Sequence, residues 1–336
     1  MQYKALGKTG LAVSAVGFGG IPIQRIDAAG TRRLMEKLVE KGVNYIDTAR
    51  GYTVSEEYLG TALAGLRDKF ILATKSMSRT YADMKRDIEI SLKNLQTDTI
   101  DIYQLHNINK EVEFTTVFGP NGAMQALLEA KAAGKIRHIG GTAHTVQGFA
   151  RLLEHPEIET MMFPYNIVEN QGEALMQQAA AQGVGVIAMK PLAGGNITNG
   201  RLALKYILQN ENCTLAIPGM AEITEIEENC AAVQESADFT DEELVELGDI
   251  RQALSGNFCR RCGYCAPCTV GIDIPGLFVL QGYLNKYDLA GWAKQRYASS
   301  AVKADACVSC HVCESRCPYN LPIAEKMKKV AEDFGR

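Results

Sequence analysis

Residues able to bind metal are concentrated near the end of this 336-residue chain. Eight of its ten cysteines lie between residues 259 and 317, whereas Cys213 and Cys230 stand alone. The first residues, MQYKALGKTG, contain no apolar signal segment, so we expect a cytoplasmic protein. Disulfides are rare in that reducing compartment, and crowded cysteines there usually bind metal. The sequence therefore predicts metal ligation by the eight clustered thiols.

The spacing of these cysteines indicates iron–sulfur clusters. The run at 307–318 reads C-x2-C-x2-C-x3-C-P, the bacterial ferredoxin spacing, in which the fourth cysteine often ligates the other cluster. The run at 259–268 reads C-x2-C-x2-C-x2-C and continues with Thr269 in place of proline, which leaves an uncrossed pairing open. Such cysteine pairs also build zinc sites, but the two further cysteines in each run favour iron–sulfur, and His311 is interpreted as a surface residue. We expect two [4Fe–4S] clusters, one on Cys259, Cys262, Cys265 and Cys317 and the other on Cys268, Cys307, Cys310 and Cys313.

Four titratable residues follow short apolar runs in the first part of the chain. Asp47 ends NYID, Tyr52 lies five residues later in DTARGY, Lys75 ends FILATK and His106 ends TIDIYQLH. Taken singly, they could be a helix cap, a packed ring, a surface cation and a core histidine. They gain a chemical meaning only if the runs that carry them are neighbouring strands.

Alternating apolar and amphipathic segments predict those strands. Residues 13–235 contain about eight strand–helix units, with VSAVGFGG as a strand and DAAGTRRLMEKLVEKG as a helix ending at Gly42. The strands are apolar on both faces, which is typical of a parallel sheet covered by helices. Eight such units favour a closed (β/α)8 TIM barrel, an α/β fold in which the carboxyl ends of the strands meet at one mouth. An open Rossmann sheet is the alternative, but GFGGIPI lacks the G-x-G-x-x-G pattern.

The cysteine runs belong to a second, α-helical domain. SADFTDEELVELGDIRQALSGN predicts a linker helix, and further helical segments flank both runs. We therefore divide the chain into a barrel at 1–235 and a small helical domain at 236–336. A domain of about 100 residues is expected to depend on its metal sites for stability.

The four titratable residues and their surroundings resemble a known family. DTARGY, the lysine of LATK and the histidine of DIYQLHN are similar to the Asp–Tyr–Lys–His tetrad of the aldo-keto reductase superfamily. KIRHIG, YN at 165–166, PLAGG, IPG and EEN follow in the family's order, so the resemblance runs from Tyr3 to Val233. The tail resembles the ferredoxin-like, two-cluster helical domain fused to one branch of these enzymes. The resemblance implies an NAD(P)(H)-dependent oxidoreductase that interconverts a carbonyl and an alcohol.

The residue types suit that chemistry. Carbonyl reduction needs a hydride at carbon and a proton for the developing alkoxide, and a phenol with a pKa near 10 is a weak donor at neutral pH. We expect Tyr52 to be the general acid, with Lys75 lowering its pKa and Asp47 holding Lys75 in place. His106 is expected to donate to the carbonyl oxygen and orient it.

The residues that the resemblance implies for the nicotinamide depart from the family pattern. A Ser–Asn pair and a Gln hold the carboxamide in relatives, and the matching residues here are Thr142, Ala143 and Met162. The aromatic that stacks on the nicotinamide is replaced by Met189, whose apolar thioether can also pack on the ring. The nicotinamide is therefore expected to be held less specifically than in relatives.

The position of the cofactor's 2′-phosphate differs as well. NADPH-preferring relatives place a Lys and an Arg where this chain has Gly219 and Glu225, and a carboxylate suits a ribose hydroxyl better than a phosphate. The pocket therefore favours NAD(H), although Lys190 could reach a phosphate. The remaining matches are Asn229 at the adenine, and Lys190, Gly194 and Gly195 at the pyrophosphate.

The composition restricts the partners of the chain. A net charge of −4 provides no footprint for nucleic acid or an anionic membrane, and no stretch is apolar enough to span a bilayer. The expected ligand is a small carbonyl or alcohol substrate. The segment NINKEVEFTTVFGPNG after His106 is expected to be a loop that shapes its pocket.

The two halves differ in redox chemistry. Clusters transfer single electrons, nicotinamide exchanges hydride, and no flavin motif is visible to connect them. We favour a reductase whose clusters are structural or sensory. The alternatives are a conduit to a ferredoxin or flavoprotein that serves a less usual reaction, and an electron-transfer module on a barrel that no longer reduces anything.

Overall fold

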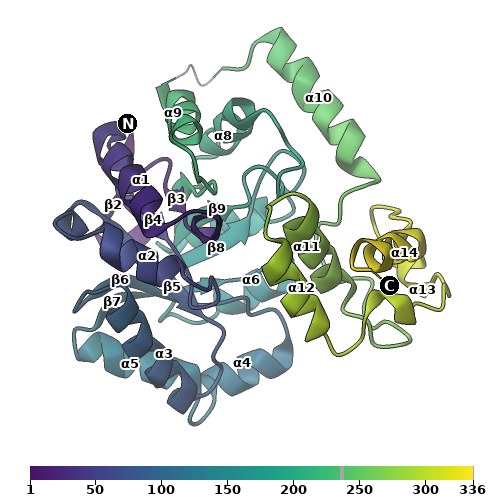
Figure 1. The fold of residues 1–336 in the computed structure, drawn as a ribbon, viewed down its shortest axis with the longest axis horizontal. Helices are drawn as coiled ribbons and strands as arrows, with labels where there is room; N and C mark the ends of the chain where they lie inside the picture. Colours follow the sequence, from purple (N-terminus) through teal and green to yellow (C-terminus); the bar gives the residue numbers. More distant parts are fainter. Residues whose placement is uncertain (235–237, 336) are drawn as a thin grey trace. The chain divides into compact units, whose positions relative to one another are not determined.

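The computed structural model describes residues 1–234 and 238–335 (Figure 1). The chain divides into two compact units, the first of Met1–Leu192 and Asn199–Phe239 and the second of Ala193–Thr198 and Thr240–Arg336. The predicted domain boundary between residues 235 and 236 lies outside the described residues, as does the start of the predicted linker helix.

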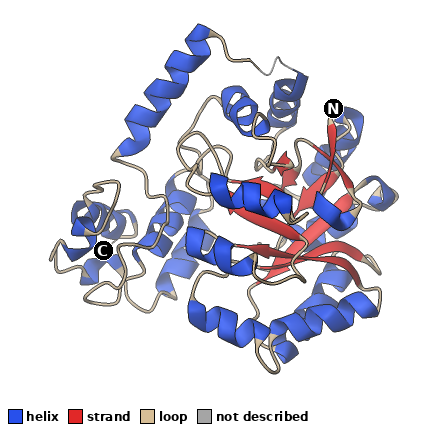
Figure 2. Ribbon diagram, turned by 180° about the vertical axis from the view of Figure 1, so that it is seen from behind, coloured by secondary structure: helices blue, strands red, loops and turns tan. Residues whose placement is uncertain are grey.

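A closed barrel of parallel strands forms the centre of the first unit (Figure 2). Its strands are β3 Phe18–Gly19, β4 Tyr45–Asp47, β5 Ile71–Ser76, β6 Ile100–Leu105, β7 Ile136–Thr142, β8 Thr160–Pro164, β9 Gly185–Met189 and β10 Leu215–Ala216. Each strand pairs with the next along the chain. The amide of Gly17 donates to the carbonyl of Ala216 (2.8 Å), and Gly19 bridges Gly219, so the first and last strands also meet. The predicted barrel is confirmed, and the open Rossmann sheet is excluded.

Helices follow the strands and surround the sheet. They are α1 Ala28–Lys41, α2 Ser55–Ala62, α3 Tyr81–Asn94, α4 Glu111–Phe118, α5 Ala123–Ala132, α6 Val146–Leu152, α7 Glu173–Ala181, α8 Gly200–Leu208 and α9 Ile223–Ala231. Helix α1 ends as predicted, because Gly42 adopts a left-handed backbone (φ 73°) that a glycine reaches at little cost. The segment predicted as a loop after His106 instead contains α4, and Glu113 caps this helix through the amides of Asn109 and Lys110.

The stretch VSAVGFGG is not one strand, as the sequence predicted, but parts of two. Its beginning belongs to β2 (Ala12–Ser14), which pairs antiparallel with β1 (Tyr3–Ala5), and its end forms β3. Ser14 separates the two, because its hydroxyl donates to the carbonyl of Val16 (2.7 Å) and its amide donates to the side chain of Asn44 (2.8 Å). Leu6 and Val13 from this hairpin pack into the apolar cluster inside the barrel.

The second unit contains α10 Asp241–Ser255, α11 Ile274–Asn285, α12 Ala290–Ala298, α13 Val312–Ser315 and α14 Ile323–Asp333. Its small core includes Leu277, Leu321, Met327 and Val330. Several of the clustered cysteines pack against this core. These cysteines therefore lie among apolar side chains.

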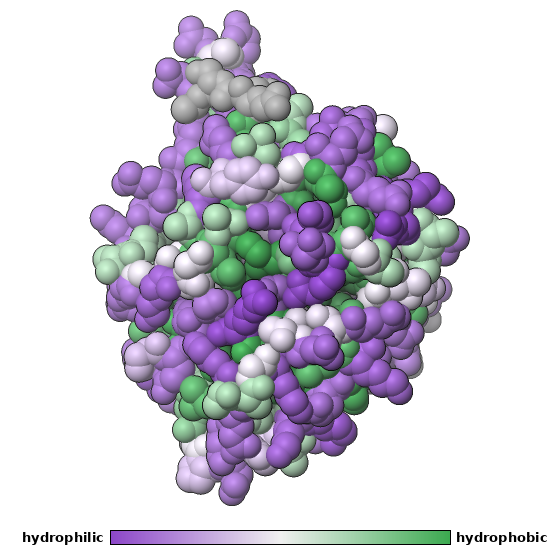
Figure 3. Space-filling view, turned by 90° about the vertical axis from the view of Figure 1, so that its left-hand side faces the viewer, coloured by the Kyte–Doolittle hydropathy of each residue, from purple (hydrophilic) through white to green (hydrophobic). Residues whose placement is uncertain are grey.

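One face of the structure is mixed in character. Figure 3 shows one face on which hydrophilic residues predominate and apolar residues gather near the middle. Among the described residues, no helix is long and apolar enough to cross a membrane.

Candidate functional site

The inner face of the barrel changes from apolar to polar toward the carboxyl ends of its strands. Side chains alternate between the two faces of a strand, so residues two apart share one face. Tyr45, Ala73 and Ile102 belong to the apolar cluster inside the barrel. Two residues further along the same strands stand Asp47, Lys75 and Gln104, all of them buried. The alternation of these short strands thus directs a carboxylate, an ammonium and an amide into the barrel interior.

Asp47 and Lys75 form a buried ion pair at this level. Lys75 Nζ donates to Asp47 Oδ2 and also to the carbonyl oxygen of Thr48 (2.9 Å). Gln104 Nε2 donates to the other carboxylate oxygen, Asp47 Oδ1, at 3.0 Å. Only 3% of Asp47 and 2% of Lys75 is exposed, so solvent does not screen their attraction. The three side chains hold one another in a fixed arrangement.

Burial shifts both members of the pair toward their neutral forms. The loss of solvation raises the pKa of Asp47, and the attraction of Lys75 and the bond from Gln104 oppose this shift. The loss of solvation likewise lowers the pKa of Lys75, and the attraction of Asp47 opposes it. A lysine with a lowered pKa gives up its proton more easily than an exposed one, and such groups are concentrated at active sites.

Tyr52 and His106 approach this pair from two loops. The amides of Thr48 and Arg50 donate to carbonyls of β5, and the amide of Tyr52 donates to Ala49 (3.0 Å), which fixes the loop after β4. Lys75 Nζ lies 5.0 Å from the centre of the Tyr52 ring. The rings of Tyr52 and His106 meet edge to face, with centroids 6.2 Å apart. The structure thus brings together all four of the predicted catalytic residues.

Two residues that support the predicted site by hydrogen bonds were not identified from the sequence. Gln104 donates a hydrogen bond to Asp47. The sequence feature that could have identified it is the alternation of Ile102, Gln104 and His106 in TIDIYQLH, which places the three on one face of the strand. Arg79 lies in the loop before α3, and its Nη2 donates to the carbonyls of His106 and Asn107 (both 3.0 Å) and to Glu113 (3.0 Å). No pattern in the sequence pointed to Arg79, because two of its three partners are backbone carbonyls of a loop that is distant in sequence.

The residues predicted to meet the nicotinamide lie around the same end of the barrel. Thr142 ends β7 and is 1% exposed, and its hydroxyl accepts from the amide of Asn107 (2.7 Å). This bond ties β7 to the residue that follows His106. Met189 ends β9, and Lys190 after it has a left-handed backbone (φ 56°), with its carbonyl held by Asn166 (2.9 Å).

The predicted pyrophosphate glycines occupy a loop of left-handed backbone. Gly194 and Gly195 have φ angles of 68° and 79°, which glycine adopts without strain. They lie in the segment Ala193–Thr198, which belongs to the second unit. Within that unit Lys286 Nζ donates to Asn196 Oδ1 at 2.5 Å.

The residues predicted for the adenine side have structural contacts of their own. Glu225 Oε2 accepts from the amides of Ala221 (2.6 Å) and Glu222 (3.0 Å) and so caps α9. Asn229 is 6% exposed on the same helix. A Cβ at Gly219 would lie 2.8 Å from the ring of Pro22, which explains the glycine independently of any cofactor.

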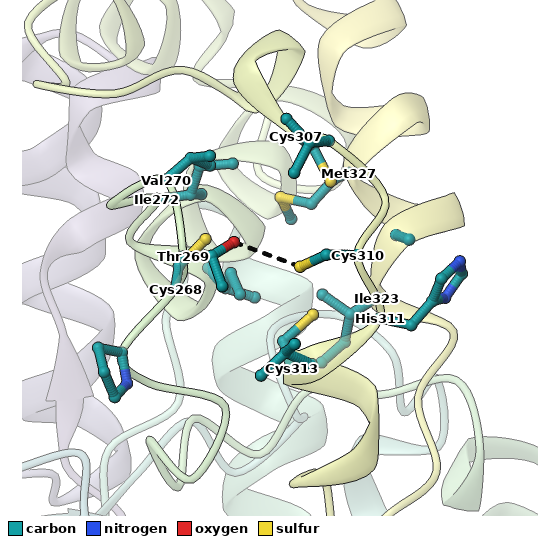
Figure 4. Close-up of a pocket in the computed structure, with 15 residues that line it drawn as sticks. Cys268, Thr269, Val270, Ile272, Cys307, Cys310, His311, Cys313, Ile323 and Met327 are labelled. Atoms are coloured by element: carbon teal, nitrogen blue, oxygen red, sulfur yellow. Dashed lines mark hydrogen bonds between the residues drawn. The ribbon is translucent and has the colours of Figure 1, made fainter.

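The eight clustered cysteines line two separate cavities of the second unit. One cavity, with an empty volume of about 390 Å³, is lined by Cys268, Cys307, Cys310 and Cys313 (Figure 4). The other, of about 310 Å³, is lined by Cys259, Cys262, Cys265 and Cys317. Each run thus contributes three cysteines to one cavity and its fourth to the other. Four thiols around a hollow are the donor set that iron–sulfur clusters use.

His311 lies beside the first cavity but its ring points away from it. The side chain is 64% exposed, and its Nδ1 lies 2.7 Å from Oε2 of Glu314. This placement agrees with a surface residue. Within residues 1–234 and 238–335, no three His, Cys, Asp or Glu side chains converge on a single metal ion, so the eight cysteines surround two cavities rather than a one-ion site.

Two family models match the chain. The model of the aldo/keto reductase family matches residues 15–202. The chain belongs to the aldo/keto reductase family. The model of a 4Fe-4S dicluster domain matches residues 258–322, which contain all eight clustered cysteines. This aldo/keto reductase is therefore an oxidoreductase with an iron–sulfur domain, as the sequence resemblance predicted.

Several known proteins are similar to this aldo/keto reductase. L-galactose dehydrogenase of Arabidopsis thaliana is 30% identical over 290 residues, covering 70% of this chain and 89% of the relative. Pyridoxine 4-dehydrogenase of Escherichia coli is 24% identical over 261 residues, covering 66% of this chain and 90% of the relative. Among solved structures, aldo-keto reductase AKR11C1 from Bacillus halodurans in its holo form has a TM-score of 0.64 and 27% identity, covering 74% of this chain and 96% of that one.

Proposed function

We propose that the barrel interconverts a carbonyl and an alcohol with NAD(P)(H), and that Tyr52 is its general acid and base. The observation that carries this proposal is the convergence of Tyr52, Lys75, Asp47 and His106 at the carboxyl ends of successive strands. This end of a barrel is where its enzymes do their chemistry. A buried lysine beside a tyrosine ring has no evident packing purpose.

Each of the four side chains has one role in this reaction. The bound cofactor supplies or removes the hydride. Tyr52 gives its hydroxyl proton to the oxygen of the reduced carbonyl, and the positive charge of Lys75 stabilises the resulting phenolate. Asp47, held by Gln104, fixes the position of Lys75. His106 donates to the carbonyl oxygen and directs it toward Tyr52.

The cofactor is proposed to be NAD(H) rather than NADP(H). Within the first unit, Lys190 offers a positive charge that suits a pyrophosphate. Gly219 provides no cation for a 2′-phosphate, and Glu225 adds a negative charge nearby although it also caps α9. We expect tighter binding of NADH than of NADPH in a fluorescence titration, and the reverse order would contradict this preference.

The two cavities are proposed to hold one [4Fe–4S] cluster each. Cys259, Cys262, Cys265 and Cys317 would ligate one cluster, and Cys268, Cys307, Cys310 and Cys313 the other. The clusters would supply structural rigidity or redox sensing, because no flavin motif is visible in the sequence to connect single-electron transfer with nicotinamide.

Replacing Tyr52 tests the catalytic assignment. A general acid contributes a factor of about 10² to 10⁴ to the rate, so Tyr52→Phe should lower kcat by at least about a hundredfold. The dissociation constant of NADH should change less than about twofold. The substrate panel should include simple aldehydes for reduction. For oxidation it should include L-galactose and pyridoxine, since two similar proteins are named as dehydrogenases of these compounds.

Tyr81→Phe is the matched control, because it removes the same hydroxyl from an exposed contact with Glu129 on another helix. It should leave the rate unchanged. A Tyr52→Phe variant with the rate of the unaltered enzyme would overturn the assignment.

A second candidate function rests on the exposure of one cluster ligand. Cys310 is exposed at the surface, whereas Cys265 in the other cavity is buried. An exposed ligand would let a ferredoxin or a flavoprotein exchange electrons with that cluster. In that case the barrel would serve a less common reaction, and reduced ferredoxin would support turnover that NADH alone does not.

A further inference from the structure

A threonine crosses the first cysteine cavity and reaches one of its thiols. Thr269 Oγ1 lies 3.3 Å from Cys310 Sγ, a contact between residues 41 positions apart (Figure 4). Thr269 directly follows Cys268, the last cysteine of its run. The corresponding residue of the other run, after Cys317, is Pro318. The first run therefore carries a side-chain hydrogen-bond donor at the position where the second run has a proline, which has no donor.

The direction of this hydrogen bond follows from the chemistry of the ligand. A cysteine that ligates iron is a thiolate and has no proton to give. Between a threonine hydroxyl and a thiolate sulfur, only the hydroxyl can donate. Thr269 itself lines the cavity that Cys268, Cys307, Cys310 and Cys313 surround.

A hydrogen bond to a ligand sulfur changes the reduction potential of a cluster. Reduction adds one negative charge, and a donor at the sulfur stabilises the more negative state more strongly. We propose that Thr269 raises the reduction potential of the cluster held by Cys268, Cys307, Cys310 and Cys313, and not that of the other cluster. This inference rests on the ligand assignment proposed above.

Thr269→Val tests the inference, because valine keeps the shape of threonine and removes its hydroxyl. The full-length protein would be purified anaerobically and titrated with dithionite while both clusters are followed by electron paramagnetic resonance. Losing the bond should lower the equilibrium constant for reduction of one cluster about tenfold. This lowers its reduction potential by about 59 mV for a one-electron step. The second cluster should keep its potential.

Two further variants make the comparison specific. Thr269→Ser keeps a hydroxyl and should keep the reduction potential close to that of the unaltered protein. Thr269→Ala also removes the hydroxyl and should lower the potential as valine does, and it replaces the valine variant if valine disturbs cluster assembly. Thr115→Val, on an exposed part of α4, is the control for the same chemical change elsewhere. Iron and sulfide content must be equal in all variants that are compared.

The outcomes separate this inference from the ligand assignment. Unchanged potentials in both Thr269→Val and Thr269→Ala, or equal shifts of both clusters, would overturn the role of Thr269 and leave the ligands in place. The assignment itself is tested by Cys310→Ser, which should remove or alter the signal of one cluster only. If both signals survive Cys310→Ser unaltered, the assignment fails and the inference fails with it.

Discussion

At the scale of single residues, the reactive arrangement depends on how firmly Asp47 is held as an anion. Burial raises the pKa of this carboxyl, while Lys75 and the amide of Gln104 lower it. Lys75 Nζ has two oxygen partners, one from Asp47 and one from the backbone of Thr48. We therefore propose that Gln104 is a positioning residue, which acts on Tyr52 through Asp47 and Lys75.

Gln104→Leu should reveal this role through the pH dependence of the reaction. The loss of the bond to Asp47 Oδ1 removes a stabilisation of the anion, so the pKa of Asp47 rises further. We expect kcat to fall about tenfold and the acidic limb of its pH profile to move to higher pH. Gln96→Leu, at an exposed contact with Thr61, is the control. An acidic limb that stays in place would show that Gln104 only fills space.

The four residues that we propose to be catalytic could be identified from the sequence, but the residues that hold them in place could not. Asp47, Tyr52, Lys75 and His106 carry a recognisable pattern of types after apolar runs. Gln104 is marked only by the alternation within its strand. Arg79 holds carbonyl groups of a loop that is distant in sequence, and backbone partners leave no trace in side-chain patterns.

At the scale of elements, residues at the two ends of the barrel strands have different roles. Residues at the carboxyl ends are available for chemistry, and those at the amino ends stabilise the fold. Glu159 precedes β8 and accepts bonds from His138 (2.8 Å), Lys131 (2.5 Å) and the amide of Ile139 (3.1 Å). Burial opposes its ionisation, but these bonds outweigh burial and lower the pKa of Glu159 to about 2.

Glu159→Gln should therefore reduce stability without reducing activity. A carboxyl with a lowered pKa stabilises the fold fully above the ordinary glutamate value of 4.5. The variant should lose about 2 kcal/mol of unfolding free energy at pH 7. The difference should narrow as the pH falls from 4.5 toward 2, because the carboxyl becomes protonated. Urea unfolding at several pH values measures it, with Glu40→Gln in an exposed ion pair as the control. Equal stability of both proteins at pH 7 would contradict the account.

The elements themselves were predictable to different degrees. Helix α1 follows from its apolar spacing and its terminal glycine. VSAVGFGG was misinterpreted as one strand because all of its residues suit a strand, and only the bonds of Ser14 to Val16 and Asn44 divide it. The helix α4 was missed because its capping carboxylate, Glu113, lies in a segment rich in turn-forming residues.

At the scale of the whole molecule, the two units differ in what stabilises them. The barrel has a large apolar core, whereas the second unit has a small one interrupted by two cysteine-lined cavities. A small domain of this kind obtains much of its folding free energy from its metal. Anaerobic removal of iron by a chelator should therefore abolish the unfolding transition of the second unit in calorimetry. The transition of the barrel should remain, and survival of both transitions would contradict this account.

The most direct test of the central claim follows both halves of the anaerobic protein at once. NADH and an aldehyde substrate would be added while the absorbance of NADH and of the clusters is recorded. If Tyr52 and its neighbours reduce the carbonyl without the clusters, NADH should be consumed in proportion to aldehyde and the cluster absorbance should stay constant. Bleaching of the clusters on addition of NADH, or no aldehyde-dependent consumption of NADH in the intact protein, would contradict the claim.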